Sequence, residues 1–119
     1  MNKDVKNKIY ATITQLHEEL DKCYEMRNTL NFDTQFPELI TTTTRIKIIK
    51  EFIELFKLVK NNSACIKPSL LQRTSVLTKR VKLHFSQLKR LQEDNLADNM
   101  IFFTTLTRVL LGLIIYKKN

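Results

Sequence analysis

The sequence predicts an all-α fold, a four-helix bundle-like domain with long amphipathic helices and short loops. Glycine and proline are scarce, with one Gly and two Pro in 119 residues, whereas turns and many loops depend on both. Apolar residues recur at spacings of three and four, the period of one helix face. A chain of this length forms one core, so we expect a single helical domain over residues 1–119.

The first expected helix covers residues 3–30. Its apolar stripe has the spacing of a helix that buries one face and consists of Val5, Ile9, Ile13, Leu16, Leu20, Cys23 and Leu30. Asp4 favours a helix start, because a negative charge meets the positive end of the helix dipole there. Pro37 disfavours helix at Phe36, so we expect the segment after residue 30 to be a loop.

The second expected helix covers residues 43–60. Four threonines precede or begin it, and Thr43 or Thr44 is the expected cap, because threonine caps helices well and fits poorly inside them. Apolar residues lie on more than one face of this helix, which indicates burial on more than one side. Phe52 and Phe56 are expected in the core or in a subunit interface.

The third expected helix covers residues 69–93 and is basic, with no Asp or Glu from Ser69 to Gln92. Its inward stripe includes Leu77 and Val81, with Leu83 and Phe85 expected at its edge. The predicted binding residues for an acidic surface are Lys79, Arg80, Lys82, Lys89 and Arg90. Their target is either an acidic protein face or DNA phosphate, and the alternative is a solvated face without a partner.

The fourth expected helix covers residues 99–116 and is the most apolar segment. At about 25 Å it is shorter than a hydrocarbon core of about 30 Å, and Arg108 near its centre opposes insertion. We therefore expect a buried helix. Its predicted core or subunit-interface residues are Leu106, Val109, Leu110 and Leu113. A tail anchor is the alternative, because Lys117 and Lys118 would suit a membrane interface.

The sequence contains no recognisable catalytic or metal-binding motif. His17 and His84 belong to no ligand or triad pattern, and Cys23 and Cys65 lack metal-ligand spacing and are expected to be buried thiols. A glycine-rich phosphate loop cannot form with Gly112 alone. We therefore expect that the chain is not an enzyme and binds no cofactor or metal. We expect His84 either to border the core or to contact phosphate.

The charge of the chain points to an acidic partner. The formal net charge is +8 and the pI is about 9.7, which suits nucleic acid, an anionic membrane or an acidic protein face. The alternative is that part of the positive charge has no function, because an AT-rich genome favours lysine codons at surface positions. No basic segment followed by an apolar stretch opens the chain, so no secretory signal is expected.

The third helix resembles a known family. The segment Leu77-Thr78-Lys79-Arg80-Val81-Lys82-Leu83-His84-Phe85, continued by Leu88-Lys89-Arg90-Leu91, resembles the basic helix of GINS subunits, particularly the first Psf-type subunit. The order of parts over residues 15–116 is also similar, with Phe36-Pro37-Glu38 and Ile66-Lys67-Pro68 in loops and Phe102-Phe103 in the last helix. The resemblance implies a reduced member that supplies a helical scaffold to a four-subunit ring associated with the replicative DNA helicase.

We therefore expect a nuclear, non-catalytic scaffold subunit whose partners are other protein subunits of a hetero-oligomeric complex. Two alternatives stay open. One is a tail-anchored or viral helical-bundle regulator that acts at a membrane, with a cytoplasmic or membrane-associated location. The other is a basic helical protein that binds nucleic acid through phosphate contacts.

Overall fold

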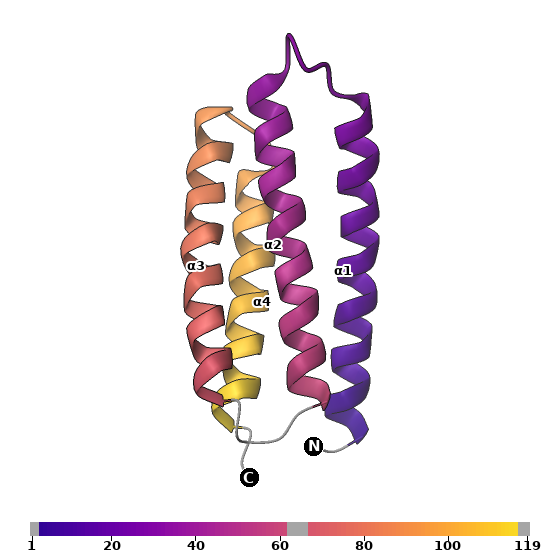
Figure 1. Cartoon of the computed structure of the whole chain (residues 1–119), viewed down its shortest axis with the longest axis vertical. Helices are drawn as coiled ribbons and strands as arrows, with labels where there is room; N and C mark the ends of the chain where they lie inside the picture. The colour runs from indigo at the N-terminus through magenta and orange to yellow at the C-terminus, as the bar shows by residue number, and fades with distance from the viewer. Residues whose placement is uncertain (1–2, 62–66, 117–119) are drawn as a thin grey trace.

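The computed structural model describes residues 3–61 and 67–116, and these form four helices and no strand (Figure 1). The helices are α1 (Lys3–Thr29), α2 (Phe36–Asn61), α3 (Lys67–Arg90) and α4 (Leu96–Tyr116). They run alternately up and down, so that the α1–α2 and α3–α4 turns lie at one end (Figure 1). The prediction of an all-α, bundle-like fold is confirmed.

The central helix is α2, which packs against α1, α3 and α4. Its buried residues lie on several faces, as its wide apolar surface predicted, and are Thr41, Thr42, Ile46, Ile48, Ile49, Phe52, Ile53, Leu55, Phe56 and Val59. The rings of Phe52 and Phe103 stack with their centroids 6.0 Å apart and join α2 to α4. Burial of such aromatic side chains supplies much of the stability of a small core.

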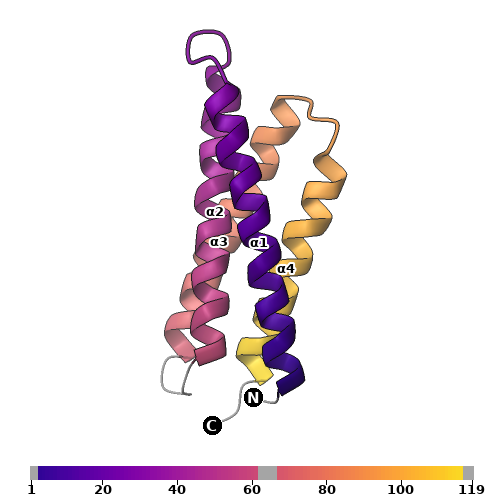
Figure 2. The same cartoon turned by 90° about the vertical axis from the view of Figure 1, so that its right-hand side faces the viewer.

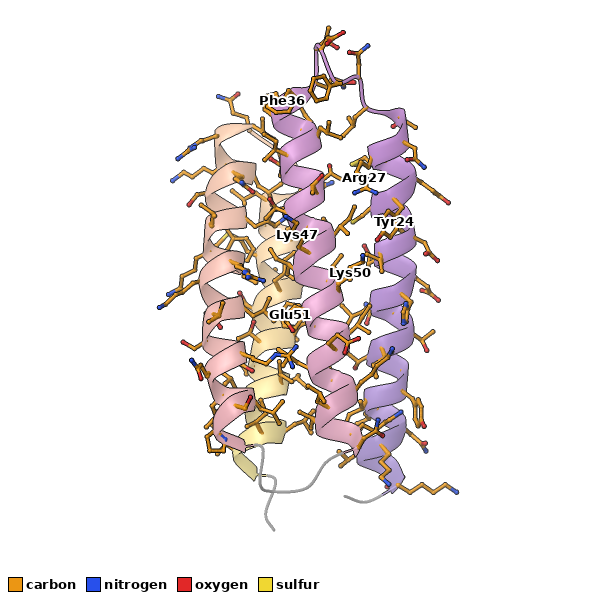
Figure 3. All side chains as sticks on the ribbon, viewed as in Figure 1. Tyr24, Arg27, Phe36, Lys47, Lys50 and Glu51 are labelled. Carbon is orange, nitrogen blue, oxygen red and sulfur yellow. The ribbon has the colours of Figure 1, made fainter. Side chains whose placement is uncertain are left out.

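Helix α1 lies along α2 and is held there by more than its apolar stripe. The ring of Tyr24 contacts two cations, Arg27 at 5.0 Å and Lys50 of α2 at 5.7 Å from its centroid (Figure 3). Near the other end, the Lys60 ammonium lies 3.7 Å from the centroid of the Tyr10 ring. Each such contact contributes about 0.5–1 kcal/mol at an exposed site. The Arg27 contact lies within α1, whereas the Lys50 and Lys60 contacts join α1 to α2 at two places along their length.

Helix α2 begins at Phe36, seven residues before the predicted start at residue 43. Pro37 lies in its first turn, where a missing N–H leaves no helical hydrogen bond unmade. The threonine hydroxyls donate to carbonyls four residues back, Thr43 to Leu39 at 2.9 Å and Thr44 to Ile40 at 3.0 Å. The prediction that Thr43 or Thr44 caps the helix is therefore wrong, because both lie in its interior.

The turn before α2 is organised by Asn31. Its Oδ1 accepts hydrogen bonds from the backbone N–H groups of Asp33 at 2.8 Å and Thr34 at 3.1 Å. Its own N–H donates to Oε1 of Gln35 at 3.0 Å. These bonds fold the chain back within a few residues, so that α1 and α2 pack as antiparallel neighbours.

The turn between α3 and α4 has the predicted length but lies three residues earlier in the chain, because α3 ends at Arg90 and α4 begins at Leu96. Gln92 adopts a left-handed conformation with φ 55°. Its N–H donates to the carbonyl of Lys89 at 3.1 Å, and the N–H of Glu93 donates to the carbonyl of Leu88 at 3.2 Å. This pair of bonds is the Schellman motif that terminates many helices.

Four residues named in the sequence predictions, Cys65, Ile66, Lys117 and Lys118, lie outside the described residues.

Candidate functional site

The five predicted binding cations of α3 are all exposed. Lys79, Lys82, Lys89 and Arg90 lie on the outer face of the helix, away from the buried stripe that includes Leu77 and Val81. Arg80 lies on a different side, where it lines a groove between α2 and α3. The structure therefore brings four of the five residues to one face and places the fifth beside it.

The groove between α2 and α3 has a volume of about 560 Å³ and is predominantly basic. Its lining residues are Thr44, Lys47, Ile48, Lys50, Glu51, Glu54, Arg73 and Arg80. Arg73 pairs with Glu51 across the groove, and Lys47 and Glu51 both project from α2 (Figure 3). Four cations against two carboxylates leave an excess of positive charge along this side of α3.

The five α3 cations have no internal partner, in contrast to three other cations of the bundle, Lys22, Arg45 and Arg73. Arg45 lies 3.8 Å from a carboxylate oxygen of Glu19, Arg73 pairs with Glu51, and Lys22 pairs with Glu19 at 3.3 Å. Within residues 3–61 and 67–116, none of the five α3 cations makes an ion pair or a side-chain hydrogen bond. Their donors are available to a partner.

A second site lies where α4 inclines away from α1 (Figure 2). This pocket of about 320 Å³ has lining residues from all four helices and the α3–α4 turn, namely Glu19, Lys22, Cys23, Met26, Thr41, Thr42, Arg45, His84, Leu88, Glu93, Asn95 and Asn99. Arg45 links its walls, because it hydrogen-bonds Asn99 of α4 and lies 4.9 Å from the centroid of the Phe103 ring. Sequence reasoning missed Arg45, whose only signal is a cation next to the apolar run of α2.

His84 is fully buried, so the prediction that it borders the core or meets phosphate is wrong. Burial, together with the nearby Arg45 guanidinium, lowers the pKa of His84 to about 4. Gln87 opposes this shift, but neither ring nitrogen of His84 has a hydrogen-bond partner of good geometry among the described residues. The imidazole is neutral at pH 7 and serves as a core side chain.

Cys23 is buried, as predicted. Burial raises the pKa of its thiol, while the nearby Arg45 opposes the rise. A thiol of raised pKa is a poor nucleophile and a poor metal ligand at neutral pH. In the described part of the chain, no three His, Cys, Asp or Glu side chains are grouped to hold a metal ion.

The predicted core or subunit-interface residues separate into two groups. Phe52, Phe56, Leu106 and Leu110 are buried, and Leu113 is partly buried against the core. Val109 is 45% exposed beside the buried stripe of α4, so it does not belong to the core of this chain. Its assignment to a subunit interface stays a prediction.

Helix α4 is only partly covered by the rest of the bundle. The segment Leu96–Ile115 is long and apolar enough to cross a membrane, and 22% of its most apolar window is buried. Phe103, Leu106, Leu110 and Ile114 form the buried stripe, whereas the exposed apolar residues of α4 are Met100, Ile101, Val109 and Ile115. The expectation of a buried helix therefore holds for one face of α4.

Comparison of the chain with known proteins found no matching family model, no matching curated protein and no matching solved structure.

Proposed function

We propose that the chain is a non-catalytic helical scaffold subunit of a multi-protein complex and that its α3 cations bind an acidic partner. The observation that carries the proposal is the contrast between these five exposed, unpaired cations and the paired Arg45 and Arg73. Like charges three or four residues apart on a helix repel each other. An acidic partner surface would relieve this repulsion and steer association.

The specific form of the proposal is a GINS-like component associated with the replicative DNA helicase in the nucleus. It is supported by the exposure of the basic helix whose sequence resembles that family. The loop positions that the resemblance implies are wrong for Phe36-Pro37-Glu38, which begins α2, and for Lys67-Pro68, which begins α3. The exposed apolar face of α4, which includes Ile101 and Val109, offers a second contact for a neighbouring subunit.

Charge reversal on α3 tests the general proposal. The variant Lys79→Glu with Lys82→Glu would be compared with a control of equal charge, Lys8→Glu with Lys57→Glu, whose lysines are exposed on α1 and α2. The readout is the amount of co-purifying partner protein. We expect the α3 variant to lose at least tenfold, or about 1.4 kcal/mol, while the control keeps its partner. Retention of the partner by both variants would contradict the proposal.

Mass spectrometry of the co-purifying proteins tests the specific form. Other GINS-like subunits recovered in stoichiometric amounts would support it. A stable complex that contains none of them would remove the replication assignment and leave the scaffold role.

The second candidate function, a tail-anchored or viral regulator at a membrane, is favoured by the exposed apolar residues of α4. Flotation with vesicles of neutral phosphatidylcholine tests it. An anchor predicts that the chain floats and that Ile101→Lys with Val109→Lys prevents flotation. Absence of the unmodified chain from the vesicle fraction would count against this candidate.

The third candidate, nucleic-acid binding, is favoured by the exposure of the same α3 cations. Duplex DNA would be titrated at two salt concentrations. Phosphate neutralisation predicts an affinity that falls steeply with salt, whereas a shallow dependence or no binding would exclude it.

A further inference from the structure

The α3 surface carries two apolar side chains among its cations. Val76 is 44% exposed and Leu83 is 56% exposed, so the prediction that Leu83 borders the core is wrong. Val76 lies three and four residues before Lys79 and Arg80, and Leu83 lies four and three residues after them. Residues at these spacings are neighbours on a helix surface, so the four side chains form one contiguous patch.

This α3 patch (Val76, Lys79, Arg80 and Leu83) borders the basic groove between α2 and α3, because Arg80 belongs to both. The two apolar side chains are seven residues apart, which is two helical turns or about 10 Å. The carboxylates that face the groove are Glu51, which pairs with Arg73, and Glu54. The patch itself contains no acidic residue, since the sequence has no Asp or Glu from Ser69 to Gln92.

We infer that the partner of the α3 patch is an acidic amphipathic helix of another protein, an inference that rests on the proposed function. Its apolar side chains at a two-turn spacing would cover Val76 and Leu83, and its flanking carboxylates would meet Lys79 and Arg80. Burial of the apolar pair would add affinity that charge pairing at a solvated surface does not supply.

A nucleic acid fits this patch less well than an acidic helix. Phosphates would pair with Lys79 and Arg80, but a phosphate backbone gives little apolar surface to Val76 and Leu83. The seven-residue spacing of Val76 and Leu83 instead matches the i and i+7 spacing of the apolar anchors in helix recognition.

Fluorescence anisotropy with three labelled probes tests the inference on the full chain. The first probe is a helical peptide of about 20 residues, with leucines at every third and fourth position and glutamates beside them. The second is a scrambled peptide of the same composition, and the third is duplex DNA. We expect the amphipathic peptide to bind about tenfold more tightly than the scrambled one.

Two variants and a matched control separate the contributions. Val76→Ser with Leu83→Ser should weaken binding of the amphipathic peptide about tenfold, since each side chain has about half its surface left to bury. Ile40→Ser, at a residue of α2 that is 42% exposed, should change it less than twofold. Lys79→Glu with Arg80→Glu should remove binding of both peptides.

The outcomes distinguish this inference from the function on which it rests. Equal binding of both peptides, unaffected by Val76→Ser with Leu83→Ser but removed by charge reversal, would overturn the inference and leave the acidic-partner function intact. Preference for duplex DNA over both peptides would also overturn it. Failure of every probe to respond to charge reversal would remove the proposed function as well.

Discussion

The imidazole of His84 meets the ring of Phe103 edge to face, with centroids 5.8 Å apart, at the contact between α3 and α4. The Arg45 guanidinium lies over the same Phe103 ring, at 4.9 Å from its centroid. A neutral imidazole suits this position, because a second positive charge would be buried beside Arg45 without a partner.

His84 should make the fold sensitive to acid. Its pKa of about 4 in the folded chain lies below the ordinary value of 6.5, so the unfolded chain binds more protons between these two values. Its contribution to the free energy of unfolding is therefore complete above pH 6.5 and decreases as the pH falls toward 4, by about 3 kcal/mol.

Urea unfolding at pH 7.5 and pH 4.5 measures this effect. The wild-type chain should lose about 2–3 kcal/mol more than His84→Leu, because leucine has no proton to bind. His17→Gln, at an exposed position, should keep the wild-type response. Equal losses in wild type and His84→Leu would contradict the assignment.

Two adjacent residues of α4 should respond differently to truncation. Leu110→Ala should reduce the free energy of unfolding by about 2–5 kcal/mol, because it removes a fully buried side chain. Val109→Ala should change it by less than about 0.5 kcal/mol, since Val109 lies on the exposed face. Chemical denaturation of the two variants checks this, and a large loss for Val109→Ala would show that its face is covered.

The start of α2 can be tested with one substitution on each side. Asn31→Ala should cost about 1 kcal/mol of unfolding free energy, because its Oδ1 accepts two backbone hydrogen bonds in the turn. Thr44→Ala should be neutral or stabilise by a few tenths of a kcal/mol, since alanine suits a helix interior better. Thermal unfolding of both variants measures these changes. A larger loss of stability for Thr44→Ala than for Asn31→Ala would show that Thr44 is the cap.

The left-handed residue at the end of α3 predicts a stabilising substitution. Gln92→Gly should raise the free energy of unfolding by about 1 kcal/mol, because glycine has no Cβ to oppose φ 55°. Gln72→Gly, at an exposed position inside α3, should lower it by a similar amount and serves as the control. A destabilised Gln92→Gly variant would show that the Gln92 side chain makes a contact that outweighs this strain.

Apolar periodicity predicted the four helices, because residues spaced like Ile9, Ile13 and Leu16 lie on one face only when the chain is helical. It did not predict where α2 begins, since Pro37 is compatible with either a loop or a first helical turn. The packing of this turn in the folded bundle determines which of the two forms. The four threonines are similarly ambiguous, because their hydroxyls can bond to the preceding helical turn as well as cap.

The exposure of the α3 cations in the candidate site could be predicted from their charge. Charged side chains are seldom buried without a partner, so the five α3 cations were expected on an exposed face. The absence of acidic residues from α3 did not reveal that Arg73 of the same helix pairs with Glu51 of α2. The positions of His84 and Leu83 were not predictable from the periodicity, because the side chains that cover a helix face come from other segments of the chain. Arg45 and Phe103 cover His84 from α2 and α4, whereas nothing in the described residues buries Leu83.

Lysine-directed cross-linking of the chain in its native complex, followed by mass spectrometry, tests the central claim that α3 is the docking face. We expect partner cross-links to concentrate on Lys79, Lys82 and Lys89, with few on the exposed Lys8 and Lys57 of α1 and α2. Cross-links confined to Lys8 and Lys57, with α3 lysines freely labelled in the complex, would contradict the account.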